Sequence, residues 1–160
     1  MTDLRLIPRP PGHPDALKMI EGSEAELAAL YPPEVRFAFS PQELIDAGVD
    51  FVVAYLGDTP VGCGGMAPCP ADPGDGARGG YGELKRIYVA PDGRRRGLAK
   101  RIVAALEETA RARGLGRMRL ETGEDSPDAI GLYGSLGYAR RGPFGAYEEN
   151  GASVFMEKRL

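Results

Sequence analysis

The sequence has 160 residues, of which 42% are hydrophobic and 27% are charged, and its formal net charge at pH 7 is −3. A chain of this length can bury a core, so we expect residues 1–160 to form a single domain. No run of about 18 apolar residues exists, which excludes a transmembrane helix, and the first residues lack the apolar core of a signal peptide. The two cysteines, Cys63 and Cys69, provide no disulfide framework, and we expect a cytoplasmic protein.

The amino-terminal third of the chain carries the weakest periodic signals. Residues 4–8 alternate weakly and predict a first strand. Residues 15–21 predict a short helix, and residues 23–30 predict a second helix with Ser23 as its N-cap. Ser40-Pro41 predicts another helix start, because proline is favoured at the first helical position.

Two strands follow in the middle of the chain. Residues 51–56 are rich in β-branched and aromatic side chains, and residues 60–66 are their expected hairpin partner. Residues 70–80 are rich in Gly, Pro and Asp and predict a flexible loop before the next strand.

The second of these strands contains a misleading glycine pattern. Its spacing Gly62-x-Gly64-x-x-Ala67 imitates a dinucleotide-binding fingerprint, which requires a helix to begin at the glycines. We reject that interpretation because Pro68 and Pro70 follow at once, and no helix can begin there. A glycine-rich strand with close neighbours is the better explanation.

A strand, a tight loop and a long helix occupy the centre of the chain. Residues 84–89 carry β-branched and aromatic side chains, and Pro91-Asp92-Gly93 breaks the chain directly after them. Beyond the break, apolar residues recur at helical spacing as far as Gly114, the expected stop. These apolar positions are Leu98, Ile102, Ala105, Leu106 and Ala110.

The loop before this helix suits an anion. A helix that opens on Gly97-Leu98-Ala99 leaves its first amide N–H groups free, with the positive end of the helix dipole behind them. The small residues let an anion approach the backbone closely, and the three arginines at 94–96 add positive charge. We interpret this loop as the seat of a pyrophosphate.

Charge is unevenly distributed along the chain. Residues 78–101 hold eight basic and two acidic side chains, so this segment carries +6 and the rest of the chain carries −9. A solvated basic face is the simplest explanation. A local positive patch on an acidic protein also favours a small polyanionic ligand over nucleic acid, which usually needs a broader basic surface. We therefore expect no nucleic acid and no membrane among its partners.

The last third of the chain predicts a strand, a helix and two further strands. Residues 118–122 alternate between apolar and charged side chains, as in a strand. Ser126-Pro127-Asp128 then caps a helix that ends at Gly137. Residues 138–141 and residues 153–158 are the last two expected strands.

Two blocks of the chain resemble a known family. The spacing Arg94-x-x-Gly97-x-Ala99 between a strand and a helix resembles the acyl-CoA-binding signature of the GNAT superfamily of N-acetyltransferases. The block Ala129-Ile130-x-Leu132-Tyr133-x-x-x-Gly137-Tyr138 resembles a second family pattern, in the family's order and separation. With the strand pattern, the resemblance covers roughly residues 51–160. It is strongest to small bacterial members with Glu-Leu-Lys-Arg at 83–86 and Leu-Glu-Thr-Gly at 120–123.

The resemblance implies both a fold and an activity. The fold is α/β, with a mixed central sheet of about six or seven strands and helices on both faces. The activity is direct transfer of an acetyl group from acetyl-CoA, the co-substrate, to a primary amine in a ternary complex. The acceptor, a small molecule or an amine of a peptide or protein, is not identified, and a homodimer is one assembly that the resemblance allows.

Two residues are candidates for proton transfer. Tyr133, with a reference pKa near ~10, can protonate the thiolate leaving group; on spacing alone it would be a tyrosine packed on a helix face, and the family pattern favours the catalytic role. Glu83 stands where some family members place a catalytic glutamate, and it is the candidate base. Because its reference pKa is only ~4.3, it needs burial or a relaying water, and pairing with a neighbouring Lys or Arg is an equal alternative.

The resemblance also implies a cofactor-binding set. The backbone of Ile87 and Val89 would hold the pantetheine arm where the fourth and fifth strands splay apart, commonly at a bulge. Main-chain amides and arginine side chains of the loop would face the pyrophosphate. Many members have Asn at the position of Ser126, which puts a ligand contact there in doubt. The full expected set is Ile87, Val89, Arg94, Arg95, Arg96, Gly97, Leu98, Ala99 and Ser126.

The sequence also bears on other chemistries and functions. The single histidine, His13, lies in a proline-rich stretch, so we expect no histidine-based nucleophile and no metal. Cys63 could carry an acyl group, but no base accompanies it in the sequence. A CoA-binding regulatory module without catalysis is the main alternative, and nucleic-acid binding through the three arginines is another. Phe144, Tyr147 and Tyr31 are candidate walls of the acceptor pocket.

Overall fold

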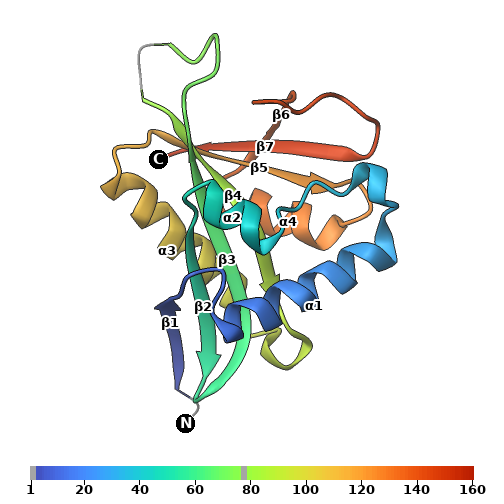
Figure 1. Cartoon of the computed structure of the whole chain (residues 1–160). Coiled ribbons are helices and arrows are strands. Elements are labelled where there is room, and N and C mark those ends of the chain that lie inside the picture. Colours follow the sequence, from blue (N-terminus) through green and yellow to red (C-terminus); the bar gives the residue numbers. More distant parts are fainter. Residues whose placement is uncertain (1–2, 77–78) are drawn as a thin grey trace.

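The computed structural model describes residues 3–76 and 79–160. Its described strands form one seven-stranded mixed sheet in the order β1-β2-β3-β4-β5-β7-β6 (Figure 1). Only β4 and β5 are parallel neighbours within it. The strands are β1 Leu4–Pro8, β2 Asp50–Leu56, β3 Thr59–Cys69, β4 Tyr81–Val89, β5 Arg117–Gly123, β6 Ala139–Arg141 and β7 Ser153–Arg159. The helices are α1 Pro14–Leu30, α2 Pro41–Asp46, α3 Leu98–Ala112 and α4 Pro127–Ser135, with short 3-10 turns η1 Pro33–Val35 and η2 Pro91–Gly93.

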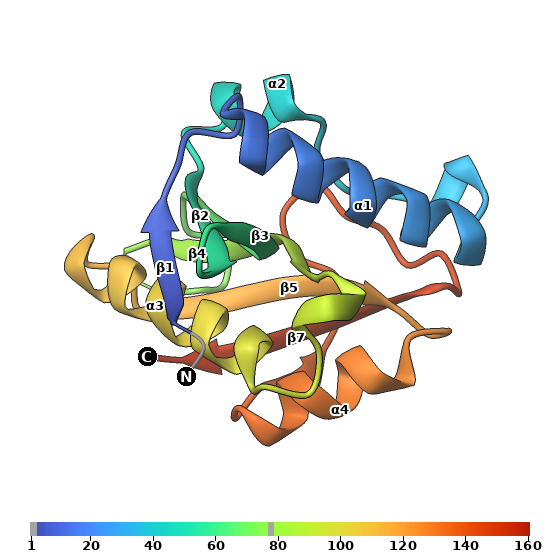
Figure 2. The same ribbon diagram turned by 90° about the horizontal axis from the view of Figure 1, so that it is seen from below.

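Helices cover both faces of the sheet, as the sequence predicts. Figure 2 shows α1 and α2 against one face and α3 and α4 against the other. The α3 face is closed by apolar side chains that include Leu98, Ile102 and Leu106. The opposite face is closed by Ala16 and Met19 of α1. The described part of the chain contains no helix that is both long and apolar enough to cross a membrane.

The structure corrects one prediction in the amino-terminal third. A single helix, α1, replaces the two helices expected there, and His13 caps it by accepting a hydrogen bond from the Asp15 amide at 3.1 Å. Ser23 is therefore not an N-cap; it is buried inside α1 and accepts a hydrogen bond from Arg86. Gly22 does not break the helix. Its role is packing, because a Cβ there would lie 2.7 Å from the Tyr88 hydroxyl.

The glycines of β3 serve packing as well, and no helix begins at them. A Cβ on Gly64 would lie 2.6 Å from methyl carbons of Ile102 and Ile87. This glycine therefore lets α3 pack closely against the centre of the sheet. The rejection of the dinucleotide-binding interpretation is confirmed, since the segment lies inside strand β3.

The sheet opens between β4 and β5. These strands pair only at Gly82 with Met118 and at Glu83 with Arg119, so the edge of β4 beyond Glu83 that faces β5 has no strand partner. A β-bulge marks the divergence: Cys63 pairs with Tyr88 and Gly65 pairs with Lys85, which leaves one extra residue on β4. Arg86, at the bulge, has a left-handed backbone with φ 54°.

A buried ion-pair network fixes the far end of these strands. Arg119 of β5 has 0% exposure and bonds Asp72, Asp75 and Glu157. Asp72 and Asp75 belong to the predicted loop between β3 and β4, of which residues 77 and 78 lie outside the described residues. The network therefore links this loop to β5 and β7, next to the last residue pair between β4 and β5.

Candidate functional site

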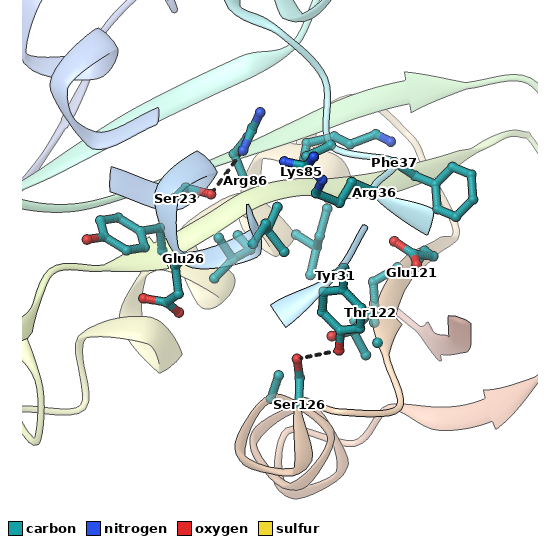
Figure 3. Close-up of a pocket in the computed structure, with 18 of the residues that line it drawn as sticks. Ser23, Glu26, Tyr31, Arg36, Phe37, Lys85, Arg86, Glu121, Thr122 and Ser126 are labelled. Atoms are coloured by element: carbon teal, nitrogen blue, oxygen red, sulfur yellow. Dashed lines mark hydrogen bonds between the residues drawn. The ribbon is translucent and has the colours of Figure 1, made fainter. Parts of the chain in front are cut away.

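A cavity of about 190 Å³ lies where β4 and β5 separate (Figure 3). The end of α1 and the residues after it form its other wall. Four of the residues predicted to be catalytic or to bind the cofactor line it, namely Glu83, Ile87, Ser126 and Tyr133. Leu84 and Tyr133 are 49 positions apart along the chain. Both line this cavity because the sheet is open between β4 and β5.

Tyr133 is held in this wall by α4. Its side chain is buried and its ring packs edge-on against Tyr138, with 5.8 Å between ring centroids. Its hydroxyl has no hydrogen-bond partner among the described residues, and burial raises the pKa of the phenol. The group is therefore protonated at neutral pH, and its O–H is available to a molecule in the cavity.

Glu83 faces the cavity as an ion pair. Its Oε2 lies 2.8 Å from Lys85 Nζ and accepts a hydrogen bond of 2.6 Å from the Tyr147 hydroxyl. Lys85 also donates to the Tyr147 oxygen and lies 3.9 Å from the centroid of the Phe39 ring. Glu83 Oε1 has no hydrogen-bond partner among the described residues, so this oxygen can accept a hydrogen bond from a bound amine.

The structure adds a carboxylate that our sequence analysis missed. Glu121 of β5 lines the same cavity and accepts one hydrogen bond, of 2.7 Å, from the Ser153 hydroxyl. Burial, with a smaller effect of the nearby Glu83 charge, raises the pKa of Glu121 to about 7. The sequence signal was its place on the strand next to the expected opening, on the opposite face from Leu120.

A second cavity, of about 400 Å³, adjoins the first and shares with it Phe37, Glu83, Lys85 and Tyr147. Phe39 and Tyr81 complete its aromatic wall. Of the three aromatic residues predicted to line an acceptor pocket, Tyr31 and Tyr147 line a cavity. Phe144 does not line either cavity; its ring is buried against Tyr81 and Phe155.

Ser126 meets Tyr31 across the first cavity. Its Oγ and the Tyr31 hydroxyl are 3.0 Å apart, which joins the start of α4 to the end of α1 (Figure 3). Ser126 holds the N-cap position, but its side chain makes no capping hydrogen bond, contrary to the prediction. Its hydroxyl thus points to the cavity, toward Tyr31.

The turn before α3 presents unpaired amides. Gly97, at the N-cap, has φ 69°, and Arg95 has φ 65°, a left-handed pattern that turns successive N–H groups toward a common point. The amides of Gly97, Leu98 and Ala99 have no acceptor among the described residues. Nothing lies within 4 Å of a Cβ built on Gly97, so the space above the turn is open.

The arginines around this turn differ from one another. Arg94 is engaged, since it donates to the Val89 carbonyl at 3.0 Å and pairs with Glu26 at 2.7 Å. Arg95 and Arg96 are exposed. All three arginines are therefore at the surface, but among the described residues only Arg94 has an ion-pair partner.

Cys63 is unsuited to carry an acyl group. It is buried, and burial raises the pKa of its thiol to about 12. The thiol donates a hydrogen bond to the Arg86 carbonyl. The described residues also contain no cluster of three or more His, Cys, Asp or Glu side chains that could hold a metal ion.

Known proteins share the sequence pattern and the fold of this chain. The sequence model of the Acetyltransferase (GNAT) family matches residues 16–138. The chain is 39% identical to "IAA acetyltransferase" of Azospirillum brasilense, over 90% of each chain. It is 30% identical to the crystal structure of a putative acyl-CoA N-acyltransferase from Klebsiella pneumoniae, with TM-score 0.77 and coverage of 98% and 97% of the two chains. A GNAT family acetyltransferase from Elizabethkingia anophelis, solved with acetyl-CoA bound, has the same fold at 17% identity, with TM-score 0.67 and 98% coverage of both chains.

Proposed function

The chain belongs to the GNAT family of acetyltransferases and is an N-acetyltransferase that uses acetyl-CoA, and on this premise we propose that it transfers acetyl directly to a primary amine in a ternary complex. One observation carries the proposal. The opening between β4 and β5 presents a protonated hydroxyl, that of Tyr133, and two carboxylates, Glu83 and Glu121, to one cavity. Acyl transfer from a thioester to an amine needs an acid and a base of this kind.

The acyl donor would bind to the free backbone amides at the start of α3. The amides of Gly97, Leu98 and Ala99 suit the diphosphate of CoA, since they combine open donors with the positive end of the α3 dipole. The side chain of Leu98 is in the core, so only its amide can take part. Arg95 and Arg96 would add charge from the surface.

The unpaired edge of β4 suits the pantetheine arm. Ile87 and Val89 lie beyond the last β4–β5 pair, so their backbone groups on that side can bond an extended amide chain as a strand would. The carbonyl of Val89 already accepts from Arg94, which leaves its amide. The hydroxyl of Ser126, opposite, can reach the arm if Tyr31 releases it.

Three side chains would take part in binding the amine and in proton transfer. Tyr133, which burial keeps protonated at neutral pH, gives its proton to the sulfur as the C–S bond breaks. Glu83, our proposed base from the sequence, holds the amine at its free Oε1. Glu121 is the better final proton acceptor, because its pKa is raised to about 7 and Glu83 is paired with Lys85.

We also propose that residues 1–160 form one domain. Strands from both ends of the chain, β1 and β7, belong to the same sheet. Residues of the amino-terminal helix α1 and of the carboxyl-terminal half line the same cavity.

A panel of amines tests the proposed reaction. Incubation with acetyl-CoA should release free thiol in proportion to an acetylated amine, with at least one amino acid, polyamine or peptide as acceptor. No acylated enzyme should form when acceptor is absent, because the transfer is direct and Cys63 is protonated. Binding of CoA without turnover of any amine would instead indicate a regulatory module.

A further inference from the structure

Arg36 is a cavity-lining cation with an unused donor. It follows η1 on the stretch that leads to α2 and lines the same cavity as Tyr133 (Figure 3). Its Nη1 bonds Glu24 at 3.3 Å, and its Nε is buried with no hydrogen-bond partner. A buried guanidinium N–H without an acceptor is costly in an empty protein, and an anionic ligand would satisfy it.

The surrounding charges favour such a ligand. Glu24 is shared, because Arg86 Nη2 also bonds it at 2.7 Å, so two guanidinium groups rest on one carboxylate that is half exposed. The other acidic side chains on this wall have their own cations: Glu83 pairs with Lys85 and Glu26 pairs with Arg94. Arg36 therefore shares its single carboxylate partner with a second guanidinium, which leaves its charge incompletely balanced.

The adjoining cavity supplies an apolar compartment. Its walls include the rings of Phe37, Phe39, Tyr81 and Tyr147, and its volume of about 400 Å³ is ample for an aromatic side chain. Phe37 follows Arg36 directly and lines both cavities. A molecule with an anionic group at Arg36 can thus extend an apolar group past Phe37 into the adjoining cavity.

We propose that the acceptor is an α-amino acid with an aromatic or large apolar side chain. Its carboxylate binds Arg36, its side chain fills the cavity lined by Phe37, Phe39 and Tyr81, and its amine reaches Glu83 and Glu121. The inference rests on the proposed function and names the class of amine that this same site accepts.

The test compares three matched amines by thiol release. L-phenylalanine carries all the proposed groups, L-phenylalaninol replaces the carboxylate with a hydroxymethyl group, and glycine lacks the side chain. For the native protein, kcat/KM should be at least about tenfold higher for phenylalanine than for either of the others, as expected when a buried charged donor loses its partner. Equal or faster turnover of phenylalaninol would overturn the assignment of the carboxylate site.

Variants of Arg36 test whether the preference for a carboxylate depends on this side chain. Arg36→Gln should lower kcat/KM for phenylalanine by about 10- to 100-fold, mainly through KM, and change that for phenylalaninol by less than about threefold. Arg36→Lys keeps the charge and should retain part of the activity. Both variants should bind CoA and melt like the native protein. An equal loss for both amines would overturn the proposal, whereas failure of every amine with the native protein would reject the acetyltransferase reaction itself.

Discussion

Replacing Tyr133 with phenylalanine should lower kcat by about 10²- to 10⁴-fold, the usual contribution of a positioned general acid. The change removes one oxygen and keeps the ring that packs against Tyr138. The hydroxyl has no partner in the described protein, so its loss should not disturb the fold. Steady-state thiol release measures kcat for the native protein and the variant. Calorimetry measures their CoA affinity separately.

Tyr138 provides the matched control for this variant. It forms the other half of the aromatic pair, but its hydroxyl bonds Glu107 at 2.8 Å, away from the cavity. Tyr138→Phe should therefore reduce thermal stability and leave kcat within about threefold. If Tyr133→Phe retains native kcat, the departing sulfur receives its proton elsewhere and the acid assignment fails.

Replacing Glu121 with glutamine should abolish an ionisation in the pH profile and lower kcat by about 10²- to 10⁴-fold. A base works only when ionised, and the pKa of Glu121 is raised to about 7 by burial. The native kcat/KM should therefore fall as pH drops below about 7 and rise toward a plateau above it. Profiles at several pH values for both proteins test this directly.

Ser153 offers a control with a different signature. Its hydroxyl donates to Glu121 and lowers the pKa of that carboxyl from what burial alone would give. Ser153→Ala should thus move the acidic limb to higher pH while the plateau rate stays close to native. An unchanged profile in both variants would assign the proton to Glu83 or to water and exclude Glu121.

Local signals explain why much of the fold was predictable. The strands at residues 51–56 and 84–89 and helix α3 have strong periodicity, and each occurs where expected. The turn at Gly97 was also predictable, because the free amides at a helix start follow from backbone geometry.

Other features depend on contacts between distant parts of the chain. Two helices were expected at residues 15–21 and 23–30, but α1 is continuous, and Gly22 packs against Tyr88 within it. Glu121 and Arg36 gain their character only when the β4–β5 opening and the segment after η1 meet at one cavity. No local pattern contains that information, so the burial of Glu121 and the unpartnered Nε of Arg36 appear only in the folded chain.

The central claim is that main-chain amides at the start of α3 hold the diphosphate of CoA. Calorimetric titration of CoA into the native protein and two variants of Gly97 tests it most directly. Asparagine and aspartate both tolerate its left-handed φ of 69°, and the space above Gly97 is open, so both variants should fold. The account predicts saturable binding to the native protein, modest weakening by Gly97→Asn, and weakening of at least about tenfold by Gly97→Asp, whose charge repels the diphosphate. Absence of binding to the native protein, or equal affinity of the aspartate variant, would contradict it.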